Sequence, residues 1–410
     1  MKVLLIGSGG REHTLAWRLA QSPHLDRLLI APGNPGTARL GQNIAIPVTD
    51  LDALADLAQR EAVDLVIVGP EDPLVHGLVD RCLARGIPAF GPTAAAARIE
   101  GSKSFAKTLM REAGVPTAAA YTFESPADAA AFVRKSARPW VVKADGLAQG
   151  KGVVVPDDPA ATLAAIERLG TTAAGTRLVL EERLYGREIS VLALCDGKTL
   201  LPLPPARDHK RLRDGDQGPN TGGMGAVAPI EDVDVAQMVA QYMQPVVDRL
   251  AARGTPFCGS LYAGLILTDA GPLVLEFNAR FGDPEAQVVL PLVEGDFLAA
   301  LADAAAGRLD PGMLRRRPGY AACVVLAAAG YPDAPRRGDP IYGTETVATS
   351  DLLLFHAGTA QRDDTLVTAG GRVLGVTGLG PNMQAALDRA YGAIRTIDFA
   401  DKQYRTDIGT

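Results

Sequence analysis

The first 100 residues alternate short apolar runs with stretches in which apolar side chains recur at helical spacing. The apolar runs have strand length and lie at residues 3–6, 28–30, 65–68 and 88–90. The helical stretches between them cover residues 11–20, 51–61 and 73–85. Alternation of strands and helices indicates a doubly wound parallel sheet. We therefore expect residues 1–100 to form a Rossmann-like α/β domain.

Ligands of doubly wound sheets bind at the carboxyl ends of the strands, which here are residues 7–12, 31–36 and 68–72. The first of these loops lacks the third glycine of a dinucleotide fingerprint, and the second has no acid placed for a ribose hydroxyl. A nicotinamide cofactor is therefore not expected. Backbone N–H groups at a helix start can still bind a simpler phosphate. We interpret the three loops as a substrate pocket, with ordinary turns as the alternative.

Beyond residue 100 the pattern predicts mixed helices and strands, without a repeat or a low-complexity linker. The predicted helices cover residues 101–114, 159–169 and 383–395. The predicted strands cover residues 140–143, 152–155, 178–181, 191–195, 264–268, 273–278, 321–327, 352–357 and 373–378. A chain of 410 residues has room for about two to four domains.

Composition excludes some classes of function. A hydrophobic content of 47% and a charged content of 21% are typical of a globular protein. The net charge of −6 gives no bulk attraction to nucleic acid or to an anionic membrane, so neither partner is expected. The apolar run that ends at Gly7 is too short for a signal peptide or a membrane span. The four cysteines lie far apart and indicate neither a metal site nor a disulfide framework, so we expect a cytoplasmic location.

The strand at residues 273–278 carries the most informative pattern. Alternate side chains of a strand share a face, so Glu276 and Asn278 should project together while Leu275 and Phe277 turn into the core. Two oxygen donors at this spacing suit Mg²⁺, which takes one or two protein ligands together with nucleotide phosphates. Arg280 follows as a fixed cation for charge on a transferring phosphoryl group. A strand end with a polar turn is the alternative.

Two further segments indicate nucleotide binding. Residues 141–155 are two strands joined by a loop with three glycines, which lets backbone N–H groups approach phosphate oxygens. The loop is not a Walker motif, because no Ser or Thr follows its Gly-Lys pair. A strand that ends within residues 179–190 would expose backbone donors and acceptors suited to the edge of an adenine ring, and Glu188 could bind the ribose hydroxyls. A flexible turn and an acidic surface turn are the respective alternatives.

In order and spacing these motifs resemble the ATP-grasp superfamily over residues 101–325. The resemblance implies two α+β subdomains that enclose ATP, with a lid at about residues 121–190. It also implies that a carboxylate is activated as an acyl phosphate, which an amine or thiol then attacks. The residues implied for ATP are Lys103, Lys143, Gly146, Gly150, Lys151, Gly152, Glu181, Glu182, Leu184 and Glu188. The implied ligands of Mg²⁺ or Mn²⁺ are Glu276 and Asn278, and the implied catalytic residues are Lys143, Arg280 and Asp208.

Further motifs extend the resemblance over essentially the whole chain, to the phosphoribosylamine–glycine ligase family of purine biosynthesis. They include Gly9-Gly10-Arg11-Glu12-His13, Asp208-His209-Lys210-Arg211, residues 218–225 and residues 280–285. The resemblance implies a monomeric ligase that joins glycine to 5-phosphoribosylamine through glycyl phosphate. It also implies a small β-rich domain at residues 326–410. The residues implied for the sugar phosphate and amine are Gly10, Asn34, Glu71, Lys210, Asn220, Thr221, Gly222, Gly223 and Asp283.

The departures from the family pattern are small. Ala279 stands where the family commonly has Cys, and Gln149 replaces a small residue of the glycine loop. The strand before Glu276 offers no third acidic metal ligand. Two alternatives stay open: another ATP-grasp ligase or carboxylase that acts on a nucleotide intermediate, and a non-catalytic ATP sensor. The sensor would be expected to lack the metal and phosphate residues, which are all present here.

Overall fold

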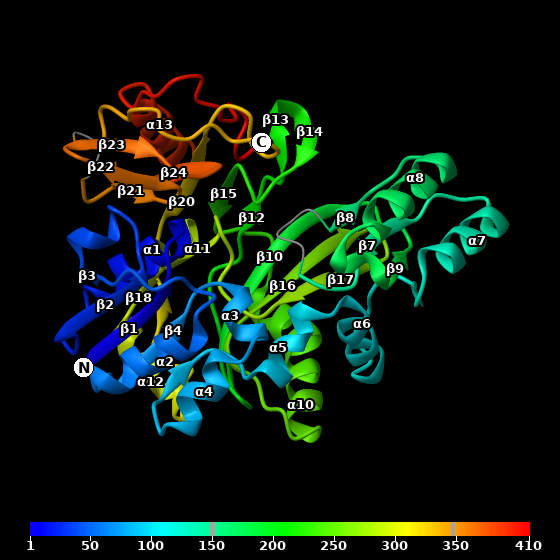
Figure 1. The fold of residues 1–410 in the computed structure, drawn as a ribbon, viewed down its shortest axis with the longest axis horizontal. Coiled ribbons are helices and arrows are strands. Elements are labelled where there is room, and N and C mark those ends of the chain that lie inside the picture. Colours follow the sequence, from blue (N-terminus) through cyan, green and yellow to red (C-terminus); the bar gives the residue numbers. More distant parts are fainter. Residues whose placement is uncertain (148–151, 346–348) are drawn as a thin grey trace.

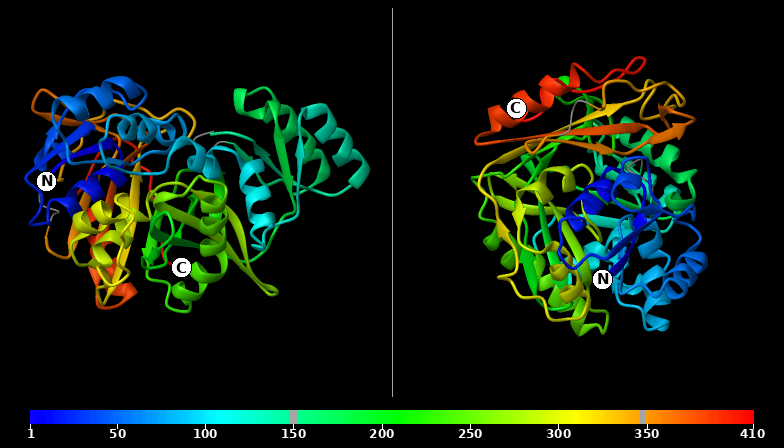
Figure 2. Two further views of the ribbon diagram at one scale, coloured as in Figure 1. Left: turned by 90° about the horizontal axis from the view of Figure 1, so that it is seen from below. Right: turned by 90° about the vertical axis from the view of Figure 1, so that its left-hand side faces the viewer.

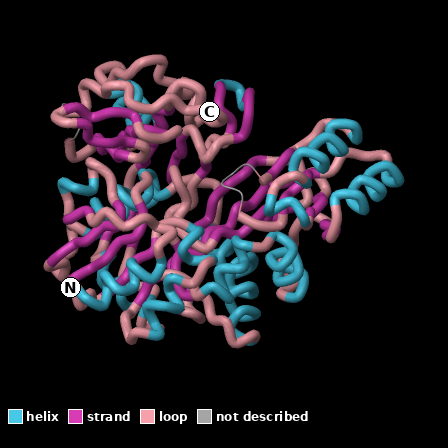
Figure 3. The backbone as a smooth tube through the Cα atoms, in the orientation of Figure 1, coloured by secondary structure: helices cyan, strands magenta, loops and turns pink. Residues whose placement is uncertain are grey.

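Four sheets of four or five strands organise the computed structural model, which describes residues 1–147, 152–345 and 349–410. Three of the sheets lie together in the body of the molecule, and the fourth forms an arm that projects from it (Figure 1). A view turned by 90° shows the same arm standing apart from the body (Figure 2, left). The strands of the arm and of the central sheet converge on the middle of the molecule (Figure 3).

The N-terminal sheet is parallel and has the order β3-β2-β1-β4-β5. Its strands are β1 (Lys2–Gly7), β2 (Arg27–Pro32), β3 (Gln42–Asn43), β4 (Leu65–Val68) and β5 (Ala89–Phe90). Its helices are α1 (Gly10–Leu19), α2 (Leu51–Arg60), α3 (Glu71–Val75), α4 (Leu78–Ala84) and α5 (Ala94–Gly101). The doubly wound sheet is thus confirmed. The single helix predicted over residues 73–85 is wrong, because Gly77 has a φ of 84° and separates α3 from α4.

The arm is an antiparallel sheet of order β6-β9-β7-β8 with helices packed against it, and it is called the lid below. Its strands are β6 (Ala120–Phe123), β7 (Val141–Ala144), β8 (Val153–Val154) and β9 (Leu178–Glu181). Its helices are α7 (Pro126–Ser136), which the sequence pattern missed, and α8 (Pro159–Gly170). Trp140, Ile166 and Leu180 belong to a hydrophobic core that the lid does not share with the body. The lid therefore has the packing of a separate unit.

The central sheet is antiparallel and has the order β11-β10-β16-β17. Its strands are β10 (Arg187–Asp196), β11 (Leu200–Pro202), β16 (Cys258–Thr268) and β17 (Gly271–Asn278). The nearby helices are α6 (Lys103–Glu112), α9 (Val235–Met238), α10 (Gln244–Ala252), α11 (Ala286–Val289) and α12 (Phe297–Ala305). One hydrophobic core includes side chains from the N-terminal sheet and from the central sheet, so the two pack as one body.

The C-terminal sheet has the order β12-β15-β20-β24-β21 and is covered by α13 (Met383–Ile394). Its strands are β12 (Arg207–Asp208), β15 (Gly225–Ala228), β20 (Tyr320–Ala327), β21 (Leu352–His356) and β24 (Arg372–Gly380). Small two-stranded pieces are β13 (Arg211–Arg213) with β14 (Gln217–Asn220), β18 (Val293–Glu294) with β19 (Arg315–Arg316), and β22 (Thr359–Arg362) with β23 (Thr365–Thr368). Strands from the middle of the chain thus complete this sheet. The boundary predicted between residues 325 and 326 lies inside β20.

The predicted fold class is confirmed: a doubly wound parallel sheet, a core of two α+β subdomains and a smaller β-rich part follow one another. Among the described residues, no helix is both long and apolar enough to cross a membrane.

Candidate active site

Glu276 and Asn278 line a cavity from the end of β17, and a bulge at Leu275 precedes them in that strand. Glu276 pairs with Gly264, but Val274 pairs with Leu265, so Leu275 has no partner on β16. The prediction that Leu275 turns into the core is wrong: its side chain is half-buried and lines the cavity, while Phe277 is buried as expected. The extra residue breaks the alternation of faces.

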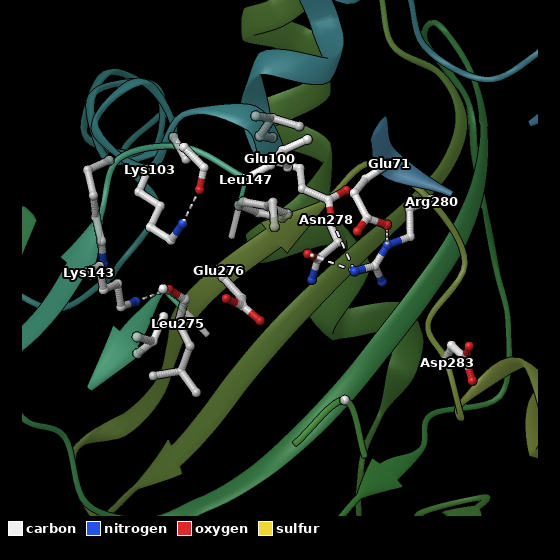
Figure 4. Close-up of a pocket in the computed structure, with 18 of the residues that line it drawn as sticks. Glu71, Glu100, Lys103, Lys143, Leu147, Leu275, Glu276, Asn278, Arg280 and Asp283 are labelled. Atoms are coloured by element: carbon white, nitrogen blue, oxygen red, sulfur yellow. Dashed lines mark hydrogen bonds and ion pairs between the residues drawn. The ribbon is translucent and has the colours of Figure 1, made fainter. Parts of the chain in front are cut away.

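Two adjoining cavities of about 370 and 310 Å³ share a wall that contains Lys143, Glu181, Glu276, Asn278 and Arg280. The larger cavity reaches toward the N-terminal sheet and the smaller one extends along the lid and the segment around β12 to β14. In Figure 4, Glu276 lies between the two lysines on one side and Asn278 with Arg280 on the other. The predicted metal ligands and phosphate cations therefore meet in one place.

Four cations from different parts of the chain surround Glu276. Lys103 begins α6, and its Nζ donates to the carbonyl oxygen of Gly146 at 2.9 Å. Lys143 Nζ, from β7, lies 3.3 Å from the carbonyl oxygen of Leu275. Burial alone would raise the pKa of Glu276, but Lys210, Lys143, Lys103 and Arg280 together hold it below the ordinary value. Glu276 is thus a carboxylate that can accept a metal ion at neutral pH.

Glu181, predicted as an ATP residue, bridges two buried lysines. Its Oε1 lies 3.0 Å from Lys143 Nζ and its Oε2 lies 2.8 Å from Lys107 Nζ. Lys107 also donates to Thr117 Oγ1 at 2.6 Å, and Thr117 donates to the carbonyl oxygen of Val274. Sequence reasoning missed Lys107, although its spacing of four from Lys103 places both on one helix face. Burial lowers the pKa of Lys107 to about 8, against the opposing effect of Glu181.

Arg280 is held by two carboxylates. Its guanidinium lies 3.0 Å from Glu100 Oε1 and 3.3 Å from Glu71 Oε2. Glu100 also accepts the N–H of Ala279 at 2.7 Å. Burial would lower the pKa of Arg280, but the two acids raise it above its ordinary value. Glu71 was predicted to contact substrate and lines the larger cavity, whereas Glu100 was missed.

The smaller cavity has an apolar slot suited to a purine ring. Its apolar lining includes Val141, Val153, Leu184, Ile266 and Leu275, and Glu182 also lines the cavity. Flat apolar surfaces with a few polar groups at the rim are typical of ring-binding pockets. Glu188 lies on the same cavity, and its Oε2 is 3.1 Å from Lys210 Nζ.

Asp208 and Lys210 also line this cavity, with Lys210 Nζ 3.9 Å from Asp208 Oδ1. Burial raises the pKa of Asp208 to about 7, opposed by Lys210 and reinforced by Glu285, Glu188 and Glu276. Burial would lower the pKa of Lys210, but Asp208 and Glu188 raise it well above its ordinary value. The pair therefore offers both a cation and a weakly acidic carboxyl to a polar substrate.

Arg372 joins the C-terminal sheet to the site. It donates to the carbonyl oxygens of Gly222 at 2.5 Å and Asp283 at 2.7 Å, and its Nη2 lies 3.0 Å from Asp283 Oδ2. Burial would raise the pKa of Asp283, but Arg372 holds it below its ordinary value. Sequence reasoning missed Arg372 because nothing near it in the chain is part of the site. Asn220, Thr221 and Gly222 line the smaller cavity, and Gly223 follows directly, outside both cavity walls.

Asn34 and Gly10, both predicted as substrate residues, are also absent from the walls of the two cavities. Asn34 is 6% exposed and donates to the carbonyl oxygens of Ser8 and His356. Its Oδ1 accepts the N–H groups of Gly36 and Thr37, so the amide is fully used inside the protein. Gly10 is buried at the start of α1, where a Cβ would lie 2.7 Å from Gln287 Nε2.

The glycine loop predicted for ATP is described only at its two ends. Gly150 and Lys151 lie outside the described residues. Gly146 and Gly152 line the larger cavity, so the described ends of the loop border the site.

Family models cover almost the whole chain. The N domain of phosphoribosylglycinamide synthetase matches residues 1–100, its ATP-grasp domain matches residues 101–286 and its C domain matches residues 321–410. The chain belongs to the phosphoribosylglycinamide synthetase family. The resemblance predicted from the motifs is confirmed, and an ATP-grasp domain implies that the site binds ATP together with a divalent metal ion.

Relatives of this family align along the full length of the chain. Phosphoribosylamine–glycine ligases of Caulobacter vibrioides and Synechocystis are 48% and 49% identical, with 100% of this chain and 98% and 99% of theirs covered. The crystal structure of phosphoribosylamine–glycine ligase from Thermotoga maritima superposes with a TM-score of 0.86 at 35% identity, with both chains fully covered. The biotin carboxylase domain of a Hydrogenobacter thermophilus carboxylase shares the fold alone, with a TM-score of 0.75 at 17% identity over 98% of this chain and 91% of that chain.

The donor set of this synthetase-family site fits a hard divalent ion. Glu276 supplies a carboxylate held in its charged form, and Asn278 supplies an amide oxygen from the same strand. Among the described residues, no group of three or more His, Cys, Asp or Glu could hold a metal ion by itself. Mg²⁺ commonly takes one or two protein oxygens and completes its shell with phosphates and water. The arrangement thus suits a metal ion that arrives with its nucleotide.

Proposed function

We propose that this protein is an ATP-dependent ligase that joins glycine to 5-phosphoribosylamine and gives glycinamide ribonucleotide, ADP and phosphate. The observation that carries the proposal is the placement of Lys103, Lys143 and Arg280 around the Glu276–Asn278 strand end, in a chain of this family. Phosphoryl transfer depends on positioning and charge neutralisation, and these are the groups that both require.

The nucleotide occupies the smaller cavity and the shared wall. Adenine fits the apolar slot beside Leu184 and Leu275, and the backbone of Glu182 to Leu184 offers its donors and acceptors to the ring edge. Glu188 accepts hydrogen bonds from the ribose hydroxyls. Lys103 and Lys143 would bind the phosphates, and Glu276 with Asn278 would hold Mg²⁺ or Mn²⁺, which would supply positive charge beside the phosphoryl group.

The reaction proceeds in two steps. A carboxylate oxygen of glycine attacks the γ-phosphorus of ATP, the bond to the β-phosphate oxygen breaks, and ADP leaves. The amine nitrogen of phosphoribosylamine then attacks the carbonyl carbon of glycyl phosphate, and phosphate leaves with the bridging oxygen. Arg280 offsets the charge on the phosphoryl group in both steps. Because water would hydrolyse the acyl phosphate, the lid excludes it from the cavity.

The sugar phosphate and its amine occupy the region where the two cavities meet the C-terminal sheet. Lys210, Asn220, Thr221 to Gly223 and Asp283 contact this substrate, with Glu71 on the side of the N-terminal sheet. Asp208 is suited to accept the proton that the amine loses, because its pKa of about 7 lies near neutral pH. The Asn34 amide supports the loop from inside, so its contribution is to the shape of the pocket.

The test is ADP release by the purified protein with ATP, Mg²⁺, glycine and freshly prepared phosphoribosylamine, with each omitted in turn. The expected result is ADP formation that requires both co-substrates, together with a product of glycinamide ribonucleotide mass. Lys143→Met is the inactive control, because it removes a phosphate cation from the site. Turnover that does not depend on glycine would instead support an ATP-grasp enzyme with another carboxylate substrate. Tight ATP binding without turnover would support the sensor. The cytoplasmic location and the monomeric state stay predictions.

A further inference from the structure

Residues 403–409, called the clamp segment below, run from the end of β20 to the base of the β13–β14 hairpin. Gln403 exchanges two backbone hydrogen bonds of 2.8 Å with Ala327 at the end of β20. At the other end, the N–H of Gly409 donates to His209 Nε2 at 3.2 Å. His209 lies between Asp208 and Lys210, so the clamp segment contacts the stretch of chain that carries these two cavity residues.

Arg405 is the centre of the clamp segment. Its side chain is 2% exposed, and its guanidinium donates to Asp216 Oδ1 at 2.6 Å and to both carboxylate oxygens of Asp407 at 2.6 and 2.7 Å. It also donates to the carbonyl oxygen of Arg211 at 3.3 Å. A guanidinium this buried is stable only when its donors are paired, so the hairpin and the clamp segment are fixed together.

Three further contacts join the same two segments. The N–H and the hydroxyl of Thr406 both donate to the carboxylate of Asp214, the N–H at 2.8 Å. The N–H of Gly215 donates to Asp407 Oδ2 at 2.8 Å. The turn between β13 and β14 is therefore held almost entirely by polar contacts with the clamp segment, whereas Leu212 packs in a small apolar cluster.

Tyr391 ties the clamp segment to α13, the helix that covers the C-terminal sheet. Its hydroxyl donates to the carbonyl oxygen of Arg405 at 3.0 Å and accepts the N–H of Ile408 at 3.1 Å. One side chain of the helix thus fixes the backbone on both sides of Asp407. Movement of the clamp segment away from α13 would require both bonds to break.

The open end of the hairpin carries residues of the smaller cavity. Thr221 donates twice to the carbonyl oxygen of Lys210, from its N–H at 2.8 Å and from its hydroxyl at 2.9 Å. Lys210, Asn220 and Thr221 all line the cavity. The clamp segment therefore fixes the turn of the β13–β14 hairpin, and the other end of the hairpin places Lys210, Asn220 and Thr221 at the cavity.

We propose that the clamp segment, through Arg405, positions Lys210 and Asn220 for the amine substrate and leaves the lysines that bind the nucleotide phosphates unaffected. This inference rests on the proposed function, because it takes Lys210 and Asn220 as contacts of phosphoribosylamine. Lys210 Nζ lies 3.1 Å from Glu188 Oε2, so the clamp segment is linked to the ribose end of the nucleotide and is separated only from the phosphate end. Among the described residues, no hydrogen bond or ion pair joins residues 403–409 to α6 or β7, which carry Lys103 and Lys143.

The test compares Arg405→Lys and Asp216→Asn with the wild-type protein. Lysine keeps the positive charge of Arg405 but lacks the planar guanidinium that binds two carboxylates at once. Asp216 is the partner of Arg405 in the hairpin, and its side chain is 72% exposed. We expect kcat/KM for phosphoribosylamine to fall about tenfold to a hundredfold in Arg405→Lys, the scale of a small misplacement of binding groups. The KM for ATP and the Kd for ADP should change far less, because Lys103 and Lys143, which bind the phosphates, are held by other elements. Arg336→Met is the matched control, since Arg336 binds Asp339 and Asp401 in the same part of the fold without contacting the hairpin.

A double-mutant cycle separates positioning from a general loss of stability. If Arg405 acts through Lys210, Arg405→Lys should cost much less in a Lys210→Gln background than in the wild type. Additive losses, or parallel changes in the kinetic constants of all three substrates, would overturn the inference. A wild-type protein without ligase turnover would refute the proposed function instead, whereas an active wild type with an unaffected Arg405→Lys variant would refute the clamp alone.

Discussion

Lys107 Nζ lies 2.8 Å from Glu181 Oε2, so a lysine of the body and a carboxylate of the lid meet inside the protein. The other oxygen of Glu181 lies 3.0 Å from Lys143, which belongs to the lid as well. All three side chains are more than nine-tenths buried. Glu181 is therefore paired with both lysines, and Lys107 weakens the electrostatic attraction that holds Lys143 before the nucleotide binds.

Replacement of Lys107 by methionine should weaken both stability and nucleotide binding. The change leaves Glu181 with one cation in place of two, and we expect a loss of about 3 kcal/mol in the free energy of unfolding. Because Lys143 must then balance Glu181 alone, the KM for ATP should rise. Urea denaturation and steady-state kinetics measure the two effects. Arg111→Met, an exposed change on the same helix, is the control and should alter neither.

Arg280→Lys should reduce turnover far more than stability. A lysine keeps the charge but cannot contact Glu71 and Glu100 with a planar fork. We expect kcat to fall about a hundredfold, as when one donor to a developing charge is removed. Comparison of kcat with the melting temperature checks this. A variant with wild-type kcat would show that Arg280 serves only to pair the two acids.

Substitutions of Glu276 and of Asn278 should change the metal dependence of activity differently, because Glu276 provides a charged carboxylate oxygen and Asn278 a neutral amide oxygen. Glu276→Gln removes the charged donor, so the Mg²⁺ concentration for half-maximal activity should rise at least about tenfold. Asn278→Asp keeps an oxygen at the same place and should retain metal-dependent turnover. Titration of activity with Mg²⁺ and with Mn²⁺ measures both. Equal metal dependence of Glu276→Gln and the wild type would place the metal elsewhere.

The shared placement of Glu276, Asn278 and Arg280 at one strand end could be predicted from strand periodicity and short spacing. Their convergence with Lys103 and Lys143, which lie far away in the chain, was implied only by the resemblance to the ATP-grasp superfamily. The position of Leu275 could not be predicted, because one bulge residue reverses the face of every residue before it. Local patterns give no sign of such a bulge.

Long-range contacts account for most of what the sequence did not indicate. Glu100, Arg372 and Arg405 each act on residues 89 or more positions away in the chain. Asn34 is a different case: the family resemblance implied a substrate contact, and in the structure its oxygen accepts the backbone N–H groups two and three residues ahead. The same residue type serves a turn or a ligand, and only the fold decides between them.

Acidification should destabilise the protein through its buried histidines. Burial lowers the pKa of His13 to about 3 and that of His356 to about 4, from 6.5 in the unfolded chain. Both are neutral when folded, so their contribution is complete above pH 6.5 and is lost as the pH falls toward 4. Each can lower the free energy of unfolding by up to about 1.4 kcal/mol per pH unit.

Urea unfolding at pH values of about 7.5, 6.5 and 5.5 measures this slope. His356→Gln removes one titrating group while a side chain that can hydrogen-bond to Thr359 remains, so its slope should be shallower than that of the wild type. His24→Gln, at an exposed position, should leave the slope unchanged. Equal slopes for all three proteins would contradict the assignment to His356.

The most direct test of the account follows the oxygen atoms of glycine. With both carboxylate oxygens labelled as ¹⁸O, attack on the γ-phosphate and displacement by the amine should leave one ¹⁸O in each phosphate released and one in the amide of the product. Mass spectrometry of the phosphate gives the answer within a single turnover experiment. One label per phosphate is the result expected for glycyl phosphate, and unlabelled phosphate would contradict it.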